Sequence, residues 1–318
     1  MQASAQAQPN IALVKYWGKR DVAANLPATG SISITLDSLW TRMSVNFGVA
    51  DDLLIVNGVP ADEMLPRVTR CLDSVAGKGR AGARVTSASN FPIAAGLASS
   101  ASAFAALVVA ASDAAGCGHE RAELSRLAGR ASGSAARSLF DGFVELAITS
   151  AGIDVTTLAG PAEWPLQVIV AVTEEAGKAV GSGDAMIRCA QTSPFYQSWV
   201  DRQDEDLAAA RAAIARRDFA KLGAIAEHNC LKMHSVMWGA RPPIVYWTKA
   251  TLACMETVRG LQDAGHAVFF TIDAGPQVKV VCLPESAEAA QAALASTEGV
   301  RKTMQSALGI GARKVTVD

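Results

Sequence analysis

The sequence is poor in aromatic residues and has no long run of charge of either sign. Aromatic residues make up 6% of the 318 residues, and they are not interleaved with basic residues as in surfaces that stack nucleic-acid bases. Lys and Arg number 29 and Asp and Glu 30, which gives a formal net charge of −1. These absences argue against a role on nucleic acid or on a membrane surface.

Several common sequence signals are also absent. The six cysteines are scattered without a CxxC pair, which favours reduced thiols in a cytosolic protein. The first 15 residues lack the basic and then apolar layout of a signal peptide, and the apolar run around 101–111 is too short to span a bilayer. We therefore expect a soluble, cytoplasmic protein that makes no membrane contact.

The chain also lacks the motifs of hydrolases, zinc enzymes and common nucleotide-binding folds. It has no GxSxG nucleophile motif, and His228 and His234 do not have the i, i+4 spacing that places two zinc ligands on one helix face. Neither the P-loop pattern nor the dinucleotide pattern GxGxxG is present.

The most informative stretch is residues 90–104, NFPIAAGLASSASAF. A loop with a proline and Gly96 leads into an expected helix whose first turn carries Ser99 and Ser100. Free backbone N–H groups and the helix dipole favour an anion at such a helix start, and serine hydroxyls can bind phosphate oxygens or magnesium. The alternative is an ordinary core helix whose serines cap its own backbone.

Two further segments carry candidate chemistry. Residues 131–142, ASGSAARSLFDG, form a second loop of glycine and serine that we expect to open a helix, with Arg137 inside it. Asp273 ends an expected strand and precedes a tight turn, where a carboxylate can hold a substrate hydroxyl or, alternatively, only cap the turn. Lys15 follows another strand, and a lysine near Asp273 would lower its pKa and counter developing negative charge.

The periodicity predicts two domains of an α+β class, divided at residues 162 and 163. The first domain is expected to have one strand that starts from residue 10 and further strands near 32–36 and at 43–49, 52–58, 83–89 and 142–149. The strands at 43–49 and 52–58 are expected to pair with each other. Its expected helices are 61–78, 97–115 and 121–130, and 150–165 is interpreted as connecting material. The second domain is predicted to have helices 183–201, 203–216, 218–236, 243–264 and 285–297 on one face of a mostly antiparallel sheet with strands 166–172, 267–273, 277–283 and 313–317.

An ordered set of motifs resembles one known family. NFPIAAGLASSASAF is similar to the phosphate-binding loop of the GHMP kinase superfamily. Together with NIALVKYWGKRD, the GSISITL segment, SGSAARSLF and DAGP, it resembles the diphosphomevalonate decarboxylases. These motifs follow one another from residue 10 to residue 276.

The resemblance implies a fold and an activity. It implies an N-terminal domain (1–162) like domain 2 of ribosomal protein S5, and a ferredoxin-like C-terminal domain (163–318), with the active site between them. The implied enzyme uses ATP and Mg²⁺ to phosphorylate the 3-hydroxyl of mevalonate 5-diphosphate. Loss of phosphate and carbon dioxide then gives isopentenyl diphosphate in the mevalonate pathway of isoprenoid biosynthesis. Such enzymes are commonly homodimers.

The resemblance also assigns residues. Asp273, Lys15 and Arg137 match the catalytic set, in which Arg137 holds the substrate carboxylate. Residues matching those around the substrate are Tyr16, Lys19, Ser132, Ser134 and Ser193. Residues matching the ATP and phosphate loop are Asn90, Gly96, Ala98, Ser99 and Ser100, with Ser100 the candidate magnesium ligand.

Two positions depart from the usual family pattern, and they leave the choice between diphosphate and monophosphate open. Gln277 follows DAGP where relatives often have Asn, and Gly181 and Ser182 replace a more usual pair of serines. The alternatives are a mevalonate monophosphate decarboxylase or a mevalonate 3-kinase. A nucleic-acid-binding module without catalysis is an alternative from another class, and it would show tight RNA binding without ATP turnover.

Overall fold

The computed structural model describes residues 1–91, 99–150, 152–174 and 180–316. Its helices are α1 (Leu65–Ala76), α2 (Ser99–Ala115), α3 (Arg121–Ala131), α4 (Ser182–Thr192), α5 (Tyr196–Asp201), α6 (Gln203–Arg216), α7 (Phe219–Trp238), α8 (Lys249–Asp263) and α9 (Ala287–Ala295). None of the helices in these ranges is both long enough and apolar enough to cross a membrane.

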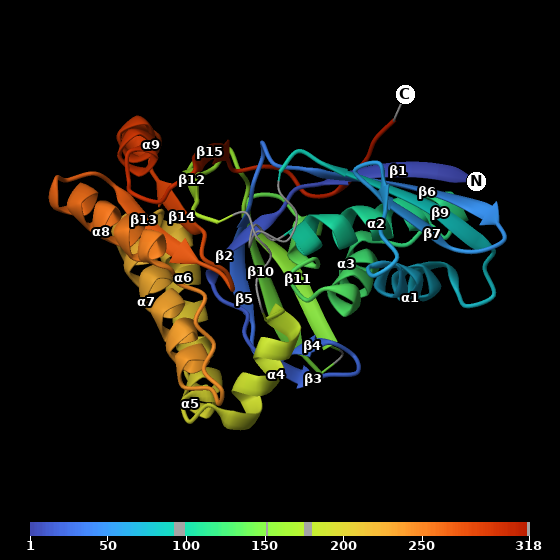
Figure 1. The fold of residues 1–318 in the computed structure, drawn as a ribbon, viewed down its shortest axis with the longest axis horizontal. Coiled ribbons are helices and arrows are strands. Elements are labelled where there is room, and N and C mark those ends of the chain that lie inside the picture. Colours follow the sequence, from blue (N-terminus) through green and yellow to red (C-terminus); the bar gives the residue numbers. More distant parts are fainter. Residues whose placement is uncertain (92–98, 151, 175–179, 317–318) are drawn as a thin grey trace.

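Within these described ranges the strands form three larger sheets and one short hairpin (Figure 1). The first sheet has the order β16-β1-β6-β9-β7-β8, the second β11-β10-β5-β2, and the third β13-β14-β12-β15. The bounds are β1 (Gln2–Ala7), β2 (Asn10–Val14), β3 (Lys19–Asp21), β4 (Leu26–Pro27), β5 (Ser31–Thr35), β6 (Thr41–Val49), β7 (Leu53–Val56), β8 (Val59–Pro60), β9 (Gly82–Ser89), β10 (Phe143–Thr149), β11 (Gly152–Ala159), β12 (Gln167–Val172), β13 (Val268–Ile272), β14 (Val278–Cys282), β15 (Lys302–Ala307) and β16 (Arg313–Lys314).

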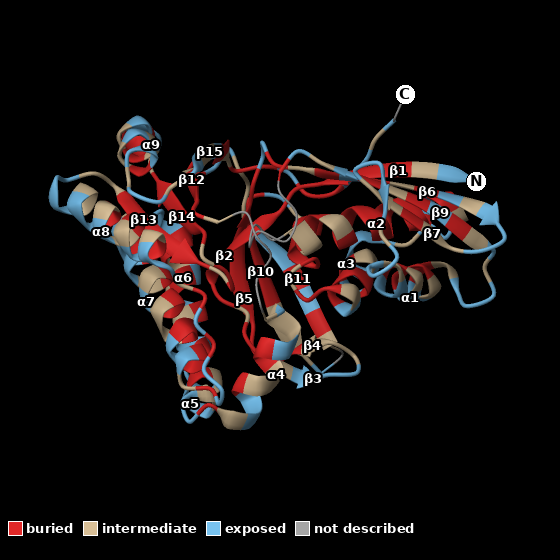
Figure 2. Cartoon of the chain, in the orientation of Figure 1, coloured by how far each residue is buried: buried red, intermediate tan, exposed pale blue. Residues whose placement is uncertain are grey.

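Helix α2 packs against β1 and β6 of the first sheet, α1 and α3 lie beside it in the same core, and α2 is the most deeply buried of the three (Figure 2). Its alanines and small residues allow close approach to β1 and β6, which explains why most of the helix is inside the core. The start of α2, with Ser99 and Ser100, remains at the edge of this core and faces a cavity. A buried helix therefore fixes the position of the two serines.

The second and third sheets share a core that brings the two halves of the chain together. Ile11, Ile32 and Phe143 of the second sheet lie in one cluster with Val168 and Phe269 of the third. The opposite face of the third sheet, with Phe270, packs against α8 and α9. Helix α7 contacts both β2 and β13, so it lies where the ends of these two strands meet.

Most predicted elements are confirmed, but several pairings and bounds differ. The strands expected at 43–49 and 52–58 exist, yet they do not pair, because β9 lies between β6 and β7. The segment after Ser132 forms only a short 3₁₀ turn, Arg137–Leu139, where a helix was expected. The stretch 150–165 contains the strand β11, and β15 is a strand that the sequence reading missed.

The helices of the second half also differ in detail. The helix expected over 183–201 is divided into α4 and α5 near Pro194, and the helix expected from 243 begins only at Lys249. The third sheet is antiparallel as expected, but its helices are not all on one face, since the cluster on the other face includes residues of α6 and α7. The last strand, β16, pairs with β1 in the first sheet.

Candidate active site

Lys15 and Asp273, far apart in sequence, form an ion pair where β2 and β13 end. The Lys15 Nζ atom lies 2.7 Å from Asp273 Oδ1 and also donates to the Ala12 carbonyl oxygen at 2.8 Å. The Lys15 side chain is 1% exposed, whereas that of Asp273 is 25% exposed. The carboxylate is therefore the more accessible member of the pair.

A second lysine, which the sequence reading did not single out, completes this cluster. Lys279 on β14 is fully buried, and its Nζ atom lies 3.2 Å from Asp273 Oδ2. Its signal in the sequence is a single charge within the apolar strand VKVVC. Each carboxylate oxygen of Asp273 thus has a lysine beside it.

These two lysines determine the charge of Asp273. Burial raises the pKa of the Asp273 carboxyl group, but the charges and hydrogen bonds of Lys15 and Lys279 outweigh this effect and hold it well below its usual range. Burial lowers the pKa of Lys279. Asp273 is therefore an ionised hydrogen-bond acceptor at neutral pH and a weak base.

Arg137 is a buried cation held by neutral groups. Its Nε atom donates to Ser33 Oγ at 2.9 Å, another guanidinium nitrogen donates to Ser31 Oγ, and Asn10 Oδ1 accepts at 3.2 Å. Burial lowers the pKa of Arg137 to about 10. Among the described residues no carboxylate lies within ion-pair distance of it, so its charge is available to an anionic ligand.

Tyr16 and Lys19 extend the site along the loop after β2. The Tyr16 ring lies so close to Gly133 that a Cβ atom there would overlap it, which explains the glycine in the serine loop. Burial raises the pKa of Tyr16 to about 12, so its hydroxyl stays protonated as a donor. Burial, followed by the charge of Arg67, lowers the pKa of Lys19.

The predicted phosphate-binding residues have three different outcomes. Ser99, Ser100, Ser132 and Ser134 all line the cavity described below. The Asn90 side chain instead accepts from the Trp40 N–H at 2.7 Å and donates to the Ser38 carbonyl oxygen, so it closes a surface turn. Gly96 and Ala98 fall outside the described residues.

One cavity of about 1180 Å³ joins these groups. Its lining includes the cations Lys15, Lys19, Arg67, Arg70, Arg130 and Arg137 and the acids Glu63, Asp184 and Asp273. The excess of positive charge suits anionic ligands, and the volume exceeds the range of about 300–1000 Å³ usual for a site that holds one small molecule. The cavity is therefore both large and cationic, as a site for phosphorylated ligands requires.

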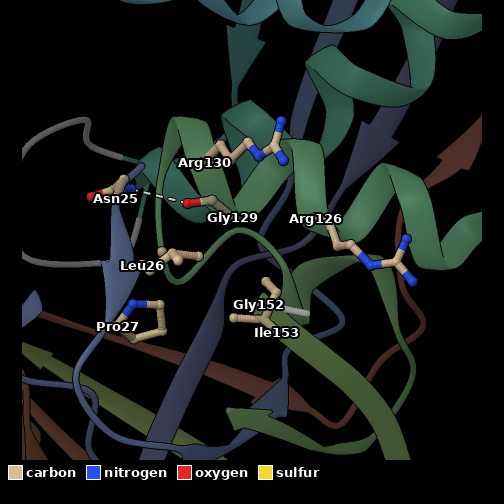
Figure 3. A pocket seen from close by; sticks show the side chains of 9 residues that line it. Asn25, Leu26, Pro27, Arg126, Gly129, Arg130, Gly152 and Ile153 are labelled. Atoms are coloured by element: carbon tan, nitrogen blue, oxygen red, sulfur yellow. Dashed lines mark hydrogen bonds between the residues drawn. The ribbon is translucent and has the colours of Figure 1, made fainter. Parts of the chain in front are cut away.

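A second cavity, between Pro27, Gly129 and Ile153, is much smaller (Figure 3). It measures about 30 Å³, and Asn25 beside it donates from its side chain to the Gly129 carbonyl oxygen at 3.0 Å. A space of this size holds one or two water molecules, not a substrate.

Ser193 lies outside the lining of the large cavity. It lies in the turn between α4 and α5, its Oγ atom is near Phe195 N and Gly239, and it does not line the large cavity. The serine of the second half that does line the cavity is Ser182, at the start of α4. The expectation that Ser193 lies near the substrate stays a prediction.

The departure at Gln277 has a structural explanation. The Gln277 Oε1 atom accepts from the Thr173 N–H at 2.6 Å, and its Nε2 atom donates to the Glu174 carbonyl oxygen. The residue thus joins the turn after Asp273 to the end of β12 and does not line the cavity.

Comparison with known protein families gives one consistent match. The family model described as diphosphomevalonate decarboxylase-like N-terminal domain matches residues 7–157. The model described as mevalonate 5-diphosphate decarboxylase C-terminal domain matches residues 168–315.

Individual relatives agree with this match. The diphosphomevalonate decarboxylase of Aspergillus fumigatus is 34% identical over 90% of this chain and 78% of its own length. The mevalonate diphosphate decarboxylase structure from Staphylococcus aureus is 34% identical, with a TM-score of 0.92 over 99% of this chain and 98% of its own. A structure of MDDEF with MVAPP, AMPPCP and magnesium is 35% identical, with a TM-score of 0.92 over 100% of this chain and 99% of that one. Since sequence, fold and the motifs agree over nearly the whole length, the chain belongs to the diphosphomevalonate decarboxylase family.

Proposed function

We propose that this protein is an ATP-dependent diphosphomevalonate decarboxylase, which converts mevalonate 5-diphosphate to isopentenyl diphosphate. The observation that carries the proposal is one cationic cavity in which Lys15, Asp273 and Arg137 face the serine-bearing start of α2. The relative crystallised with MVAPP, AMPPCP and magnesium supports the same substrate, an ATP co-substrate and Mg²⁺.

The reaction begins at the tertiary 3-hydroxyl group. Asp273 accepts a hydrogen bond from this hydroxyl and holds its oxygen toward the terminal phosphate of ATP. Lys15 and Lys279 keep the carboxylate ionised, and Lys15 counters negative charge as the phosphoryl group is transferred. Because the pKa of Asp273 is held so low, its contribution is orientation and charge, with little basicity.

Decarboxylation follows from the departure of the new phosphate group. Positive charge develops at C3 as the C–O bond breaks, and the electrons of the C–C bond to the carboxylate move to form the alkene while carbon dioxide leaves. Arg137 pairs with the substrate carboxylate and holds it in the required orientation. Tyr16, Lys19, Ser132 and Ser134 lie around the substrate diphosphate.

Ser99 and Ser100 face the ATP phosphates at the positive end of α2. Among the described residues no group of three His, Cys, Asp or Glu side chains could hold a metal ion. In sites that bind nucleotide phosphates, Mg²⁺ usually takes most of its ligands from phosphate oxygens and water. The Ser100 hydroxyl is the protein ligand that we assign to it. When bound, the ion neutralises phosphate charge.

A purified-protein assay tests the proposal. The protein is supplied with ATP, Mg²⁺ and either mevalonate 5-diphosphate or mevalonate 5-phosphate, and ADP and carbon dioxide are measured separately. We expect equal release of both products with the diphosphate. ADP without carbon dioxide would identify a 3-kinase, and preference for the monophosphate would identify the related decarboxylase.

We also propose a cytoplasmic homodimer of two-domain subunits. All six cysteines are free, which supports a reducing compartment. The proposed division at 162 and 163 falls in the interval between the two family matches. Light scattering of the purified protein measures the subunit number directly.

A further inference from the structure

Two buried amide side chains hold the backbone of Lys15 from the second half of the chain. Gln203 begins α6 and Asn229 lies in α7, and both are fully buried. Neither lines the large cavity, so neither can touch a substrate there. The mechanism above gives these two residues no role.

The Lys15 peptide groups need partners outside the sheet. Strand β2 ends at Val14 with an irregular register after Ala12, so the ladder to β5 does not extend to Lys15. The Lys15 N–H donates to Asn229 Oδ1 at 2.7 Å, and the Lys15 carbonyl oxygen accepts from Gln203 Nε2 at 2.6 Å. Both polar backbone groups of the lysine are therefore held by side chains.

The two amides also hold each other. Asn229 Nδ2 donates to Gln203 Oε1 at 3.0 Å, which closes a ring of hydrogen bonds through the Lys15 backbone. The same nitrogen donates to Asp206 Oδ2 at 2.6 Å, and Asp206 pairs with Lys232 at 2.6 Å. Because every amide atom has a partner, each side chain has one orientation and one position.

The helix that carries Asn229 also holds the strand that carries Asp273. Cys230, the next residue, contacts the Ile272 backbone, with its Sγ atom 3.2 Å from the Ile272 N–H donor and 3.4 Å from the carbonyl oxygen. Ile272 directly precedes Asp273. Successive residues of α7 thus hold the backbone at Lys15 and the backbone beside Asp273.

We propose that Gln203 and Asn229 are positioning residues, which fix the distance between Lys15 and Asp273 through α7. The inference rests on the proposed function, since it assigns these amides a role in the same reaction. Gln203, Asn229 and the Lys15 backbone are called the amide clamp below. Without the clamp the Lys15 backbone shifts, and a displacement of about 1 Å at a reacting group can cost about 10²-fold in rate.

The test compares kcat and KM for isosteric variants of the clamp. Gln203→Met keeps the side-chain length and removes both hydrogen bonds, while Gln203→Glu keeps the Oε1 acceptor for Asn229 and removes the donor to Lys15. We expect both variants to lower kcat by about 10- to 100-fold, with KM for ATP and for mevalonate 5-diphosphate within about threefold of wild type. Gln203→Glu also covers the case in which Gln203→Met does not fold.

Arg211→Met is the matched control, since Arg211 lies in the same helix. Its guanidinium group makes a two-pronged ion pair with Glu145, at 3.0 and 2.7 Å, and has no bond to Lys15. We expect this variant to lose stability while kcat stays within about twofold of wild type. All variants are assayed at a temperature at which circular dichroism shows them folded.

Two results would overturn the proposal. A folded Gln203 variant with kcat within twofold of wild type would show that the clamp only satisfies buried backbone groups. A fall in kcat equal to that of Arg211→Met would show a general effect of stability. The wild-type protein in the same assay decides the proposed function separately, because the clamp is judged only by the ratio of variant to wild type.

Discussion

Asp273 has a lysine at each carboxylate oxygen, and this makes it the residue most sensitive to substitution. Asp273→Asn keeps the shape but removes the charge that orients the substrate hydroxyl, and it takes away the carboxylate that pairs with both Lys15 and Lys279. We expect kcat to fall by at least about 10³-fold, with ATP binding by calorimetry within about threefold of wild type. Asp154→Asn, an exposed carboxylate on β11, is the control. Near-normal turnover in Asp273→Asn would contradict its role.

The pH dependence of the reaction follows from two shifted groups. Asp273 ionises well below the usual carboxyl range, so it causes no loss of kcat/KM between about pH 5 and 8. Arg137 must be protonated to hold a carboxylate, and its pKa of about 10 predicts that kcat/KM falls as the pH rises through that value. The measurement is a kcat/KM profile to pH 10.5, with circular dichroism to confirm folding. A rate that is flat to the end of that range would exclude a shifted Arg137.

Single residues differ in how well the sequence predicts them. Lys15, Asp273 and Arg137 lie in continuous motifs, and the structure brings all three to one cavity. Lys279 was missed because one lysine in an apolar strand gives no local sign of the carboxylate that it faces across the turn. Ser193 lies in the turn after α4 and outside the cavity lining, which its neighbours in the sequence do not reveal, and its role near the substrate stays a prediction.

At the scale of secondary structure, the predicted bounds of strands and helices were least accurate where glycines or a capping box lie at the ends of an element. Strand β11 alternates buried Ile153 and Val155 with exposed Asp154, but glycines at 152 and 160 made the segment resemble a connection. The start of α8 is set by a capping box in which Thr248 and Thr251 bond to each other's backbone, a pattern that apolar periodicity does not reveal. Sequence periodicity thus predicted which elements exist better than where they end.

One half-buried carboxylate supports the pairing of β7 with β9, which gives a stability prediction. Asp52 accepts from two nitrogens of Arg80 at 2.7 Å and from the Ala83 N–H at 2.9 Å, so it ties the start of β7 to β9. Hydrogen bonds from Arg80, the largest cause, lower the pKa of Asp52 from 3.8 to about 2, although burial opposes them. Asp52→Asn should therefore reduce the free energy of unfolding at pH 7 by about 2 kcal/mol.

The sign of this effect can be checked by varying the pH. The folded-state pKa of Asp52 is below its unfolded value, so its contribution is complete above about pH 5 and is lost as the pH falls toward 2. Urea unfolding of wild type and Asp52→Asn should consequently give converging stabilities at low pH. Asp51→Asn, at the exposed neighbouring position, should change stability by less than about 0.5 kcal/mol.

At the scale of the whole molecule, the two ends of the chain meet in the first sheet. Strand β16 pairs with β1 in the first sheet. The segment between β15 and β16 runs from the third sheet to the first, and its residue Leu308 forms a β-bridge with Leu36. The Ala312 N–H donates to the Ser138 carbonyl oxygen, next to Arg137. The motifs that predict the fold end at residue 276, and the sequence predicted a final strand at 313–317 but assigned it to the sheet of the second domain.

This crossing segment fits only with glycine at its closest approach. A Cβ atom at Gly311 would overlap the Leu139 carbonyl oxygen, and the Gly311 N–H donates to Asp141 Oδ1 at 2.7 Å. We expect Gly311→Ala to lower the free energy of unfolding by about 2 kcal/mol in urea titrations. Gly79→Ala, which meets no atom within 4 Å, is the control and should change stability by less than about 1 kcal/mol. Equal effects of the two substitutions would contradict the packing argument.

The position of β16 has a consequence for how the protein is made. The ribosome makes β16 only after the other described strands and helices, because Arg313 and Lys314 follow all of them in the sequence. Until then the outer edge of β1 is without this partner, and the carbonyl oxygen of Ser138 lacks its bond from Ala312. The first sheet, which contains the first described strand to be synthesised, is therefore completed only after the strands of the third sheet have been made.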